Sequence, residues 1–340
     1  MSMVVPHPAR VVRAAVEFAR TADGWDLALH HYHGVPGATP MPPVILCSGY
    51  SCNRVFMDFD DRYSLARFLA RCGCDTWVLE LRGHGNSEFA GEQRTDWTFD
   101  DFVELDVPTA VRAVRQHSGR SPVWIGHSMG GLVMYAALGT DAGLGASIAG
   151  LVTMASPVAF PPLASPWLRG AAQVLAVLPG PRRVPQRGAL VALWSALNWV
   201  PGALEAGMNP VNVDRQAFGE ALRRGLCNVP RSLLHQLADW SLSGELRSSD
   251  HRVDYRATLP GITTPALIIA GAADRLAPPA IVRVAHDRIS STRKQYREFG
   301  LGQGDSADYG HVDLVFGRRA PEEIFPVIAT WIAGLLKSER

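Results

Sequence analysis

The sequence predicts an α/β fold, with a mostly parallel central sheet covered by helices on both faces and an inserted helical cap. Short apolar runs of strand length alternate with amphipathic stretches of helix length, as in parallel sheets with crossover helices. This alternation stops between Pro157 and Pro265, where prolines cluster and three helical periodicities follow. We therefore expect a core domain made of residues 1–157 and 263–340, and a helical cap over residues 158–262.

The composition is that of a globular protein with a large core, since 47% of the 340 residues are hydrophobic and 19% are charged. A formal net charge of +1, without runs of like charge, gives no electrostatic reason to expect a nucleic acid partner. The five cysteines show no C-x-x-C spacing, and the first 20 residues hold no continuous apolar segment. We expect free thiols, no metal, no stable membrane insertion and a cytoplasmic location, while the oligomeric state stays open.

The first half of the chain is expected to build most of the sheet. Residues 11–19 and 25–32 are β-rich and are joined by Asp23-Gly24, which predicts a starting hairpin. The apolar run over 44–49 predicts a central strand buried on both faces. The remaining expected elements, in order, are a helix over 61–71, a strand over 75–81, a helix over 99–117 kinked at Pro108, a strand at 123–125, a helix after Ser128, a glycine loop over 141–145 and a strand over 148–154.

The second half is expected to begin with the cap and to return to the core. Apolar residues at helical spacing predict three cap helices, over 188–200, 214–224 and 232–242. The later expected elements are a strand over 266–271, a helix over 280–289, a strand over 294–299 and a closing helix over 321–336.

The clearest functional motif is Gly126-x-Ser128-x-Gly130, which stands between an expected strand and an expected helix. A sharp strand-to-helix turn exposes a serine at the edge of the sheet, and glycines beside it let backbone segments pass closely. The helix N-terminus that follows presents unpaired N–H groups, which favour developing negative charge. The motif predicts a nucleophile at Ser128, with a structural turn serine as the alternative.

These residues, in the segment Gly126-His-Ser-Met-Gly-Gly131, resemble the nucleophile elbow of the α/β-hydrolase family, in a form typical of esterases and lipases. The resemblance covers nearly all of the chain except the middle hundred residues. It implies a chain order of serine, acid and histidine, which Ser128, Asp274 and His311 satisfy. Asp274 stands after a strand in what looks like the family's acid loop, while Asp313 is a rival for the acid because it lies two residues from His311.

The same resemblance implies an oxyanion hole. One donor would be the backbone N–H of Met129, after the nucleophile. The second would come from the loop after the first core strand, where Ser48-Gly49 stands in place of the family's His-Gly pair. By position, this donor is the N–H of Tyr50.

The implied activity is cleavage of carboxylic esters through an acyl-enzyme, without a metal or an organic cofactor. Trp194, Leu197 and Trp199 of the expected cap are predicted to contact the substrate. Because this lining is apolar and carries no evident cationic clamp, the expected substrates are moderately hydrophobic esters or lipid-like small molecules. An acyltransferase or a lactone- or polyester-processing enzyme on the same triad is the alternative, ahead of a non-catalytic binding protein.

Overall fold

A nine-stranded sheet forms the centre of the computed structural model, which describes residues 4, 6–7, 15–91, 95–160, 182–197, 204–205 and 207–336. The strands are β1 (Val16–Arg20), β2 (Trp25–Tyr32), β3 (Val44–Cys47), β4 (Thr76–Leu79), β5 (Glu88–Phe89), β6 (Val123–His127), β7 (Gly150–Met154), β10 (Ala266–Gly271) and β11 (Lys294–Phe299). Their order is β1-β2-β4-β3-β6-β7-β10-β11, and β5 pairs with β2. From β4 to β11 all neighbours are parallel, whereas β2 is antiparallel to β1 and β4.

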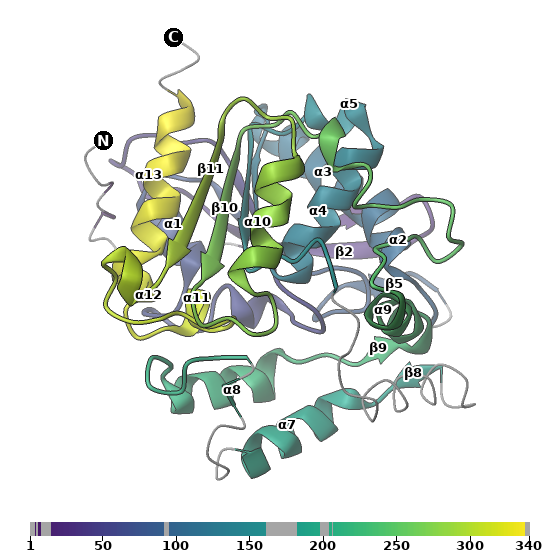
Figure 1. Ribbon diagram of the computed structural model, residues 1–340. Coiled ribbons are helices and arrows are strands. Elements are labelled where there is room, and N and C mark those ends of the chain that lie inside the picture. Colours follow the sequence, from purple (N-terminus) through teal and green to yellow (C-terminus); the bar gives the residue numbers. More distant parts are fainter. Residues whose placement is uncertain are drawn as a thin grey trace.

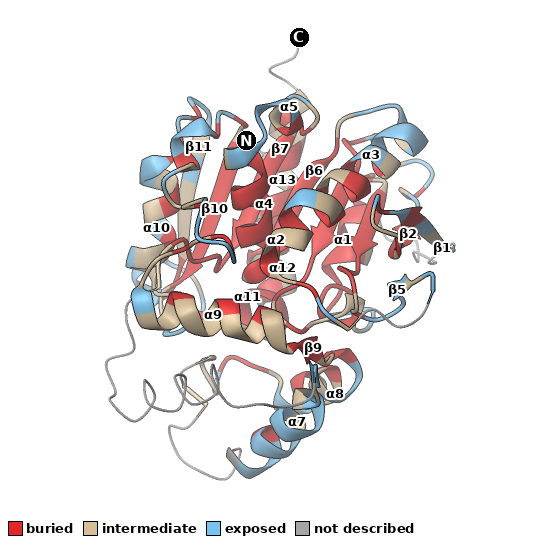
Figure 2. Ribbon diagram, turned by 90° about the vertical axis from the view of Figure 1, so that its right-hand side faces the viewer, coloured by how far each residue is buried: buried red, intermediate tan, exposed pale blue. Residues whose placement is uncertain are grey.

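Helices cover both faces of the sheet (Figure 1). The core helices are α1 (Leu65–Arg71), α2 (Phe99–Asp101), α3 (Val107–Ser118), α4 (Met129–Thr140), α5 (Ala142–Gly145), α10 (Pro279–Arg288), α11 (Asp313–Phe316), α12 (Ala320–Glu323) and α13 (Phe325–Leu336). Helices α1 and α13 lie on one face, and α3, α4 and α10 lie on the other (Figure 1). Every residue of β3, β4, β6, β7 and β10 is buried, as expected for strands covered on both faces (Figure 2).

The long helix expected over 99–117 is divided by a π-helical segment, Phe102–Asp106, between α2 and α3. The N–H of Val107 donates to the Phe102 carbonyl, and the next residue is Pro108, which has no N–H to donate. The irregularity predicted at the proline is therefore this wider turn immediately before it.

Two other expectations need correction. The glycine loop expected over 141–145 contains the short helix α5, because Asp141 Oδ1 accepts the Gly143 N–H at 2.8 Å and caps its start. The closing helix expected over 321–336 is two helices, α12 and α13, which meet at Ile324. The second residue of α13 is Pro326, which fits only near a helix start.

The insertion between β7 and β10 holds three described helices where the periodicity predicts them. These are α7 (Gln186–Leu197), α8 (Arg215–Gly225) and α9 (Arg231–Ser243), together with the short pair β8 (Arg183–Val184) and β9 (Val229–Pro230). Helices α7 and α8 lie beyond the ends of the core strands, while α9 lies against the core beside α2 (Figure 1). The surface of α7 is largely exposed (Figure 2).

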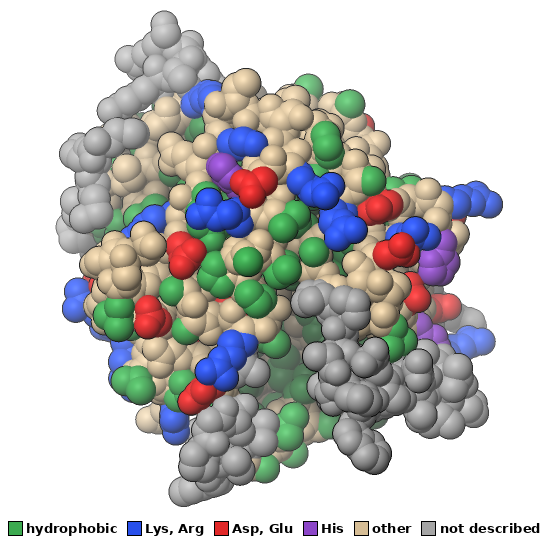
Figure 3. Space-filling model, viewed as in Figure 1, with side chains coloured by type: hydrophobic (Ala, Val, Ile, Leu, Met, Phe, Trp, Pro, Cys, Tyr) green, Lys and Arg blue, Asp and Glu red, His purple; other side chains and the backbone are tan. Residues whose placement is uncertain are grey.

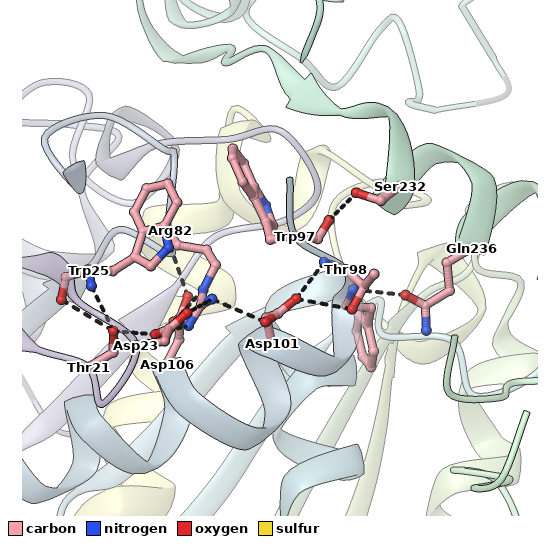
Figure 4. A network of polar contacts seen from close by, with 11 residues as sticks. Thr21, Asp23, Trp25, Arg82, Trp97, Thr98, Asp101, Asp106, Ser232 and Gln236 are labelled. Atoms are coloured by element: carbon pink, nitrogen blue, oxygen red, sulfur yellow. Dashed lines mark hydrogen bonds and ion pairs between the residues drawn. The ribbon is translucent and has the colours of Figure 1, made fainter. Parts of the chain in front are cut away.

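A buried arginine ties the turn after β4 to the helical face of the core (Figure 4). Arg82 is fully buried and forms ion pairs with Asp106 at 2.8 Å, Asp23 at 2.8 Å and Asp101 at 3.3 Å. A buried guanidinium needs this full set of partners, since an unpaired buried charge is very costly. These ion pairs hold the turn after β4 in place.

The same region joins the insertion to the core. The Ser232 hydroxyl donates to the Trp97 carbonyl at 2.6 Å, and Gln236 Oε1 accepts the Phe99 N–H at 2.8 Å (Figure 4). The ring of Trp240 also packs edge-on against Phe99, at 4.9 Å between centroids. Helix α9 is therefore the part of the insertion that packs beside α2.

No helix within the described ranges is long and apolar enough to cross a membrane. All five cysteines are unpaired.

Candidate active site

Ser128 occupies a strained turn between β6 and α4, with φ 54° and ψ −120°. The turn requires glycines on both sides, because a Cβ at Gly126 would overlap the Gly130 carbonyl and one at Gly130 would overlap the carbonyl of Cys47. The N–H of Ser128 donates to the carbonyl of Met154 at 2.8 Å, which fixes the turn to the end of β7. The hydroxyl therefore lies at the carboxyl edge of the parallel strands.

A continuous chain of hydrogen bonds runs from this serine through His311 to Asp274. Ser128 Oγ lies 2.9 Å from His311 Nε2, and His311 Nδ1 lies 2.8 Å from Asp274 Oδ2. Asp274 follows β10, and His311 follows β11, so three strand ends supply the three side chains. The structure thus brings together the three residues that the sequence singles out, from positions up to 183 residues apart.

The loop after β10 fixes the orientation of Asp274. Its Oδ1 accepts the N–H groups of Leu276 and Ala277, each at 2.8 Å, which leaves Oδ2 for His311. The carboxylate is fully buried. An acceptor held in this way fixes the Nδ1 proton of the imidazole on the acid side, so that Nε2 can accept from the serine.

His127 has a role that the sequence does not reveal. Its Nε2 lies 3.0 Å from the backbone carbonyl of His311. Burial first, and then the nearby His311 imidazole, lower the pKa of His127 to about 3. The ring is therefore neutral and donates its Nε2–H to that carbonyl, which holds the His311 loop against the elbow. Neither a spacing rule nor the motif could have indicated this contact.

Two backbone N–H groups beside Ser128 are available for an oxyanion. Within the described part of the chain, neither Met129 nor Tyr50 uses its N–H in a hydrogen bond. Gly49 keeps the Tyr50 loop close to Ser128, because a Cβ at Gly49 would stand 3.1 Å from the Cβ of Ser128. These positions match the expected donors, although their role in catalysis stays a proposal.

The insertion holds the Tyr50 loop in place. The Asn53 N–H donates to the Gly225 carbonyl at 2.8 Å, and the Cys227 N–H donates to the Ser51 carbonyl at 2.7 Å. The phenol of Tyr50 also donates to Gln186 Oε1 at 2.8 Å, at the start of α7. These contacts with the insertion therefore hold the Tyr50 loop, in which Ser48-Gly49 replaces the His-Gly pair, in its conformation.

The insertion also holds the His311 loop, through Asp313. This carboxylate accepts the Asn209 N–H at 3.1 Å and the Asn212 Nδ2–H at 3.2 Å, and the Val312 N–H donates to the Gly207 carbonyl at 3.1 Å. No hydrogen bond between described residues joins Asp313 to the His311 ring. Asp313, the alternative acid that the sequence offers, therefore faces the insertion.

Burial raises the pKa of Asp313 to about 6, against the hydrogen bonds that favour its charge. Because the folded-state pKa lies above the unfolded value of about 3.9, the carboxyl stabilises the fold below pH 4 and this contribution is lost as the pH rises through 6. As the pH is raised from 4 to 7, the free energy of unfolding of Asp313→Asn should increase relative to that of the wild type, by on the order of 3 kcal/mol. Urea unfolding across this range measures the difference, and a difference independent of pH would contradict the assignment.

The predicted substrate-contacting residues of the insertion are described only in part. Trp194 is buried and packs edge-on against Phe218 of α8, at 5.1 Å between ring centroids. No ring contact or hydrogen bond between described residues joins Trp194 to Ser128 or His311, so its substrate role stays a prediction. The side chain of Leu197 and all of Trp199 lie outside the described residues.

Apolar side chains gather around a hollow between the core and the insertion (Figure 3). Phe218 of α8, which contacts Trp194, also packs against two aromatic rings of the core. Its ring centroid lies 6.3 Å from that of Phe56 and 5.5 Å from that of Phe316. A cavity lies between the insertion and the loop after β10, lined by Met208, Asp274 and neighbouring residues.

Comparisons with known proteins agree on the fold. The family model described as alpha/beta hydrolase fold matches residues 42–302. Lipase lipl-3 of Caenorhabditis elegans is 27% identical over 144 residues, which are 38% of this chain and 36% of that protein. The chain therefore spans about a third of the length of such relatives.

Solved structures extend the likeness over the whole described fold. A thermophilic esterase from Thermogutta terrifontis has a TM-score of 0.60 at 17% identity, with 95% of this chain and 99% of that chain covered. The monoacylglycerol lipase of Paleococcus ferrophilus has a TM-score of 0.58 at 17% identity, with coverages of 88% and 96%. At such identities the likeness concerns the fold alone.

Proposed function

The chain belongs to the α/β-hydrolase fold family, and we propose that it is a serine hydrolase that cleaves carboxylic esters of moderately hydrophobic substrates. The observation that carries this proposal is the hydrogen-bond chain from Ser128 Oγ to His311 Nε2 and from His311 Nδ1 to Asp274 Oδ2, on a turn aimed at the carboxyl edge of the sheet. The lipase names of the curated relatives support an ester as the substrate.

The proposed reaction proceeds through an acyl-enzyme. His311 accepts the proton of Ser128 as the hydroxyl attacks the ester carbonyl, and Asp274 stabilises the imidazolium. The N–H groups of Met129 and Tyr50 hold the oxyanion, each worth about 2.7 to 4 kcal/mol of transition-state stabilisation in comparable enzymes. His311 then protonates the leaving alcohol, and water activated by the same imidazole releases the acid.

A fluorophosphonate probe tests this proposal directly. Covalent labelling of the wild type is expected at Ser128, as seen by peptide mass, and Ser128→Ala should take up no label. Turnover of an ester with added alcohol then separates hydrolysis from acyl transfer, because a hydrolase yields mainly the free acid. A wild-type protein that is folded but neither labelled nor active on esters would remove the proposal.

The insertion, residues 158–262, is proposed to act as a cap held on two sides. Its segment around Gly225 binds the Tyr50 loop, and its Asn209 and Asn212 bind the His311 loop. Opening the whole cap would break both sets of contacts and disturb the proposed site. We therefore expect activity on dissolved esters, without a jump at the micellar limit.

The acyl group should be recognised by apolar burial. Each CH₂ moved from water into an apolar site contributes about 0.8 kcal/mol, so two added CH₂ groups should raise kcat/KM by roughly tenfold. We expect kcat/KM for p-nitrophenyl esters to rise from acetyl to butyryl and on to octanoyl. A flat or falling series would reject the apolar acyl site and leave the nucleophile untouched.

A further inference from the structure

Five ionisable side chains gather at an edge of the sheet far from Ser128. They are Glu17 of β1, His31 near the end of β2, His33 just after it, Asp75 just before β4, and His117 in the last turn of α3. The cluster lies at the end of the sheet where the parallel strands begin, because His31 pairs with Trp77 of β4 and the neighbouring Thr76 pairs with Val44, the first residue of β3. Ser128 follows the other end of the parallel strands. The cluster is therefore separate from the proposed active site.

We propose that Glu17, His31 and His117 bind a divalent transition-metal ion, with Zn²⁺ as the best fit and water as a further ligand. Their ligand atoms all lie within 4.8 Å of one another. His31 Nδ1 lies 3.5 Å from Glu17 Oε1, and His117 Nδ1 lies 3.6 Å from Glu17 Oε2. Tetrahedral zinc with bonds of about 2.0–2.1 Å sets neighbouring ligand atoms about 3.3 Å apart. The two distances above involve different oxygens of Glu17, so the carboxylate has to turn for one oxygen and the two imidazole nitrogens to reach this spacing.

The hydrogen bonding of His31 prepares its Nδ1 as a ligand. A carboxylate can only accept hydrogen bonds, so at 2.6 Å from Asp75 Oδ1 the Nε2 of His31 carries the proton. When the ring is neutral, the lone pair of Nδ1 then faces Glu17. An imidazole that donates to a carboxylate on one side and binds a metal on the other is the usual arrangement in metal sites.

The rings are already positioned, while the site stays open to solvent. His31 is almost completely buried and stacks on Trp77, at 3.6 Å between centroids and 9° between planes. The ring of His117 packs against the same indole at 4.8 Å and 73°. Glu17 and His117 are 43% and 42% exposed, so an ion can enter from water.

A second grouping in the cluster, His31 with His33 and Asp75, fits a metal less well. The two atoms that would be ligands, His31 Nε2 and Asp75 Oδ1, lie 2.6 Å apart and are already joined by a hydrogen bond. A metal between them would have to break this bond and spread the ligands. Asp75 is therefore assigned to orienting His31, and His33 is left outside the site.

An ion at this position would link the edge strand β1 to the end of α3. Because such an ion binds only the folded chain, it should raise the unfolding temperature. Its ligands touch neither Ser128 nor His311, so the proposal stands whether or not the chain is an esterase.

Zinc binding to the metal-free full chain, measured by calorimetric titration and by thermal unfolding, tests the site. The wild type is expected to bind one Zn²⁺ that is lost in His117→Ala and in Glu17→Gln, with a Tm raised by ZnCl₂ but not by MgCl₂. His33→Ala, the matched control, should keep that ion. Asp75→Asn should weaken binding by about 10- to 100-fold.

Three outcomes would overturn the proposal. They are no binding by the wild type, binding undiminished in both His117→Ala and Glu17→Gln, and loss of the ion in His33→Ala with retention in Glu17→Gln. The substituted Glu17 and His117 side chains are partly exposed, so both variants should fold, and circular dichroism without zinc verifies this.

Discussion

Replacing Ser128 by alanine should lower kcat for a p-nitrophenyl ester by about 10⁵- to 10⁶-fold, and His311→Ala should do the same. Without the hydroxyl no acyl-enzyme can form, and without the imidazole no group accepts its proton at 2.9 Å. The double variant should be no worse than either single one, because the two side chains act as a unit. Steady-state kinetics on purified proteins measures all three.

The fold must be intact for this result to count. His286→Ala is the matched control for the histidine, since His286 lies in α10 and packs against Tyr296 at 6.1 Å. It should retain wild-type turnover and an unchanged circular dichroism spectrum. A Ser128→Ala variant with more than a few per cent of wild-type kcat would show that Ser128 is not the nucleophile.

Local patterns were sufficient to predict the sheet and the sharp turn at Ser128. Continuous apolar runs predicted strands such as β3 and β10 because both faces of such strands are covered. The Gly126-x-Ser128-x-Gly130 pattern predicted the turn because no larger side chain fits at either glycine. In each case one short segment carries the physical constraint.

Features that depend on distant segments could not be predicted in this way. The loop of Tyr50 takes its shape from Gly225 and Cys227, which lie more than 170 residues later. The hydrogen bond from His127 to the His311 carbonyl spans 184 residues. The grouping of Glu17, His31 and His117 comes from three elements whose spacing matches no metal motif, so the sequence predicted no metal there.

The choice between the two candidate acids shows the same limit. Asp274 is brought next to His311 by the fold, whereas Asp313 is near His311 because it lies two residues later in the sequence. What separates them is the direction in which each carboxylate faces, toward the imidazole or toward Asn209 and Asn212. Direction depends on the backbone groups that hold each carboxylate, and these come from other loops.

Asp274→Asn should lower kcat by about 10⁴-fold, whereas Asp313→Asn should stay within about tenfold of the wild type. In Asp274→Asn the side-chain oxygen keeps the two N–H bonds from Leu276 and Ala277, so its NH₂ group must face His311 Nδ1. The imidazole then carries its proton on Nε2, toward Ser128, and cannot accept the serine proton. Kinetics at one pH with fluorophosphonate labelling measures both variants. Near wild-type kcat in Asp274→Asn, with a large loss in Asp313→Asn, would reverse the assignment of the acid.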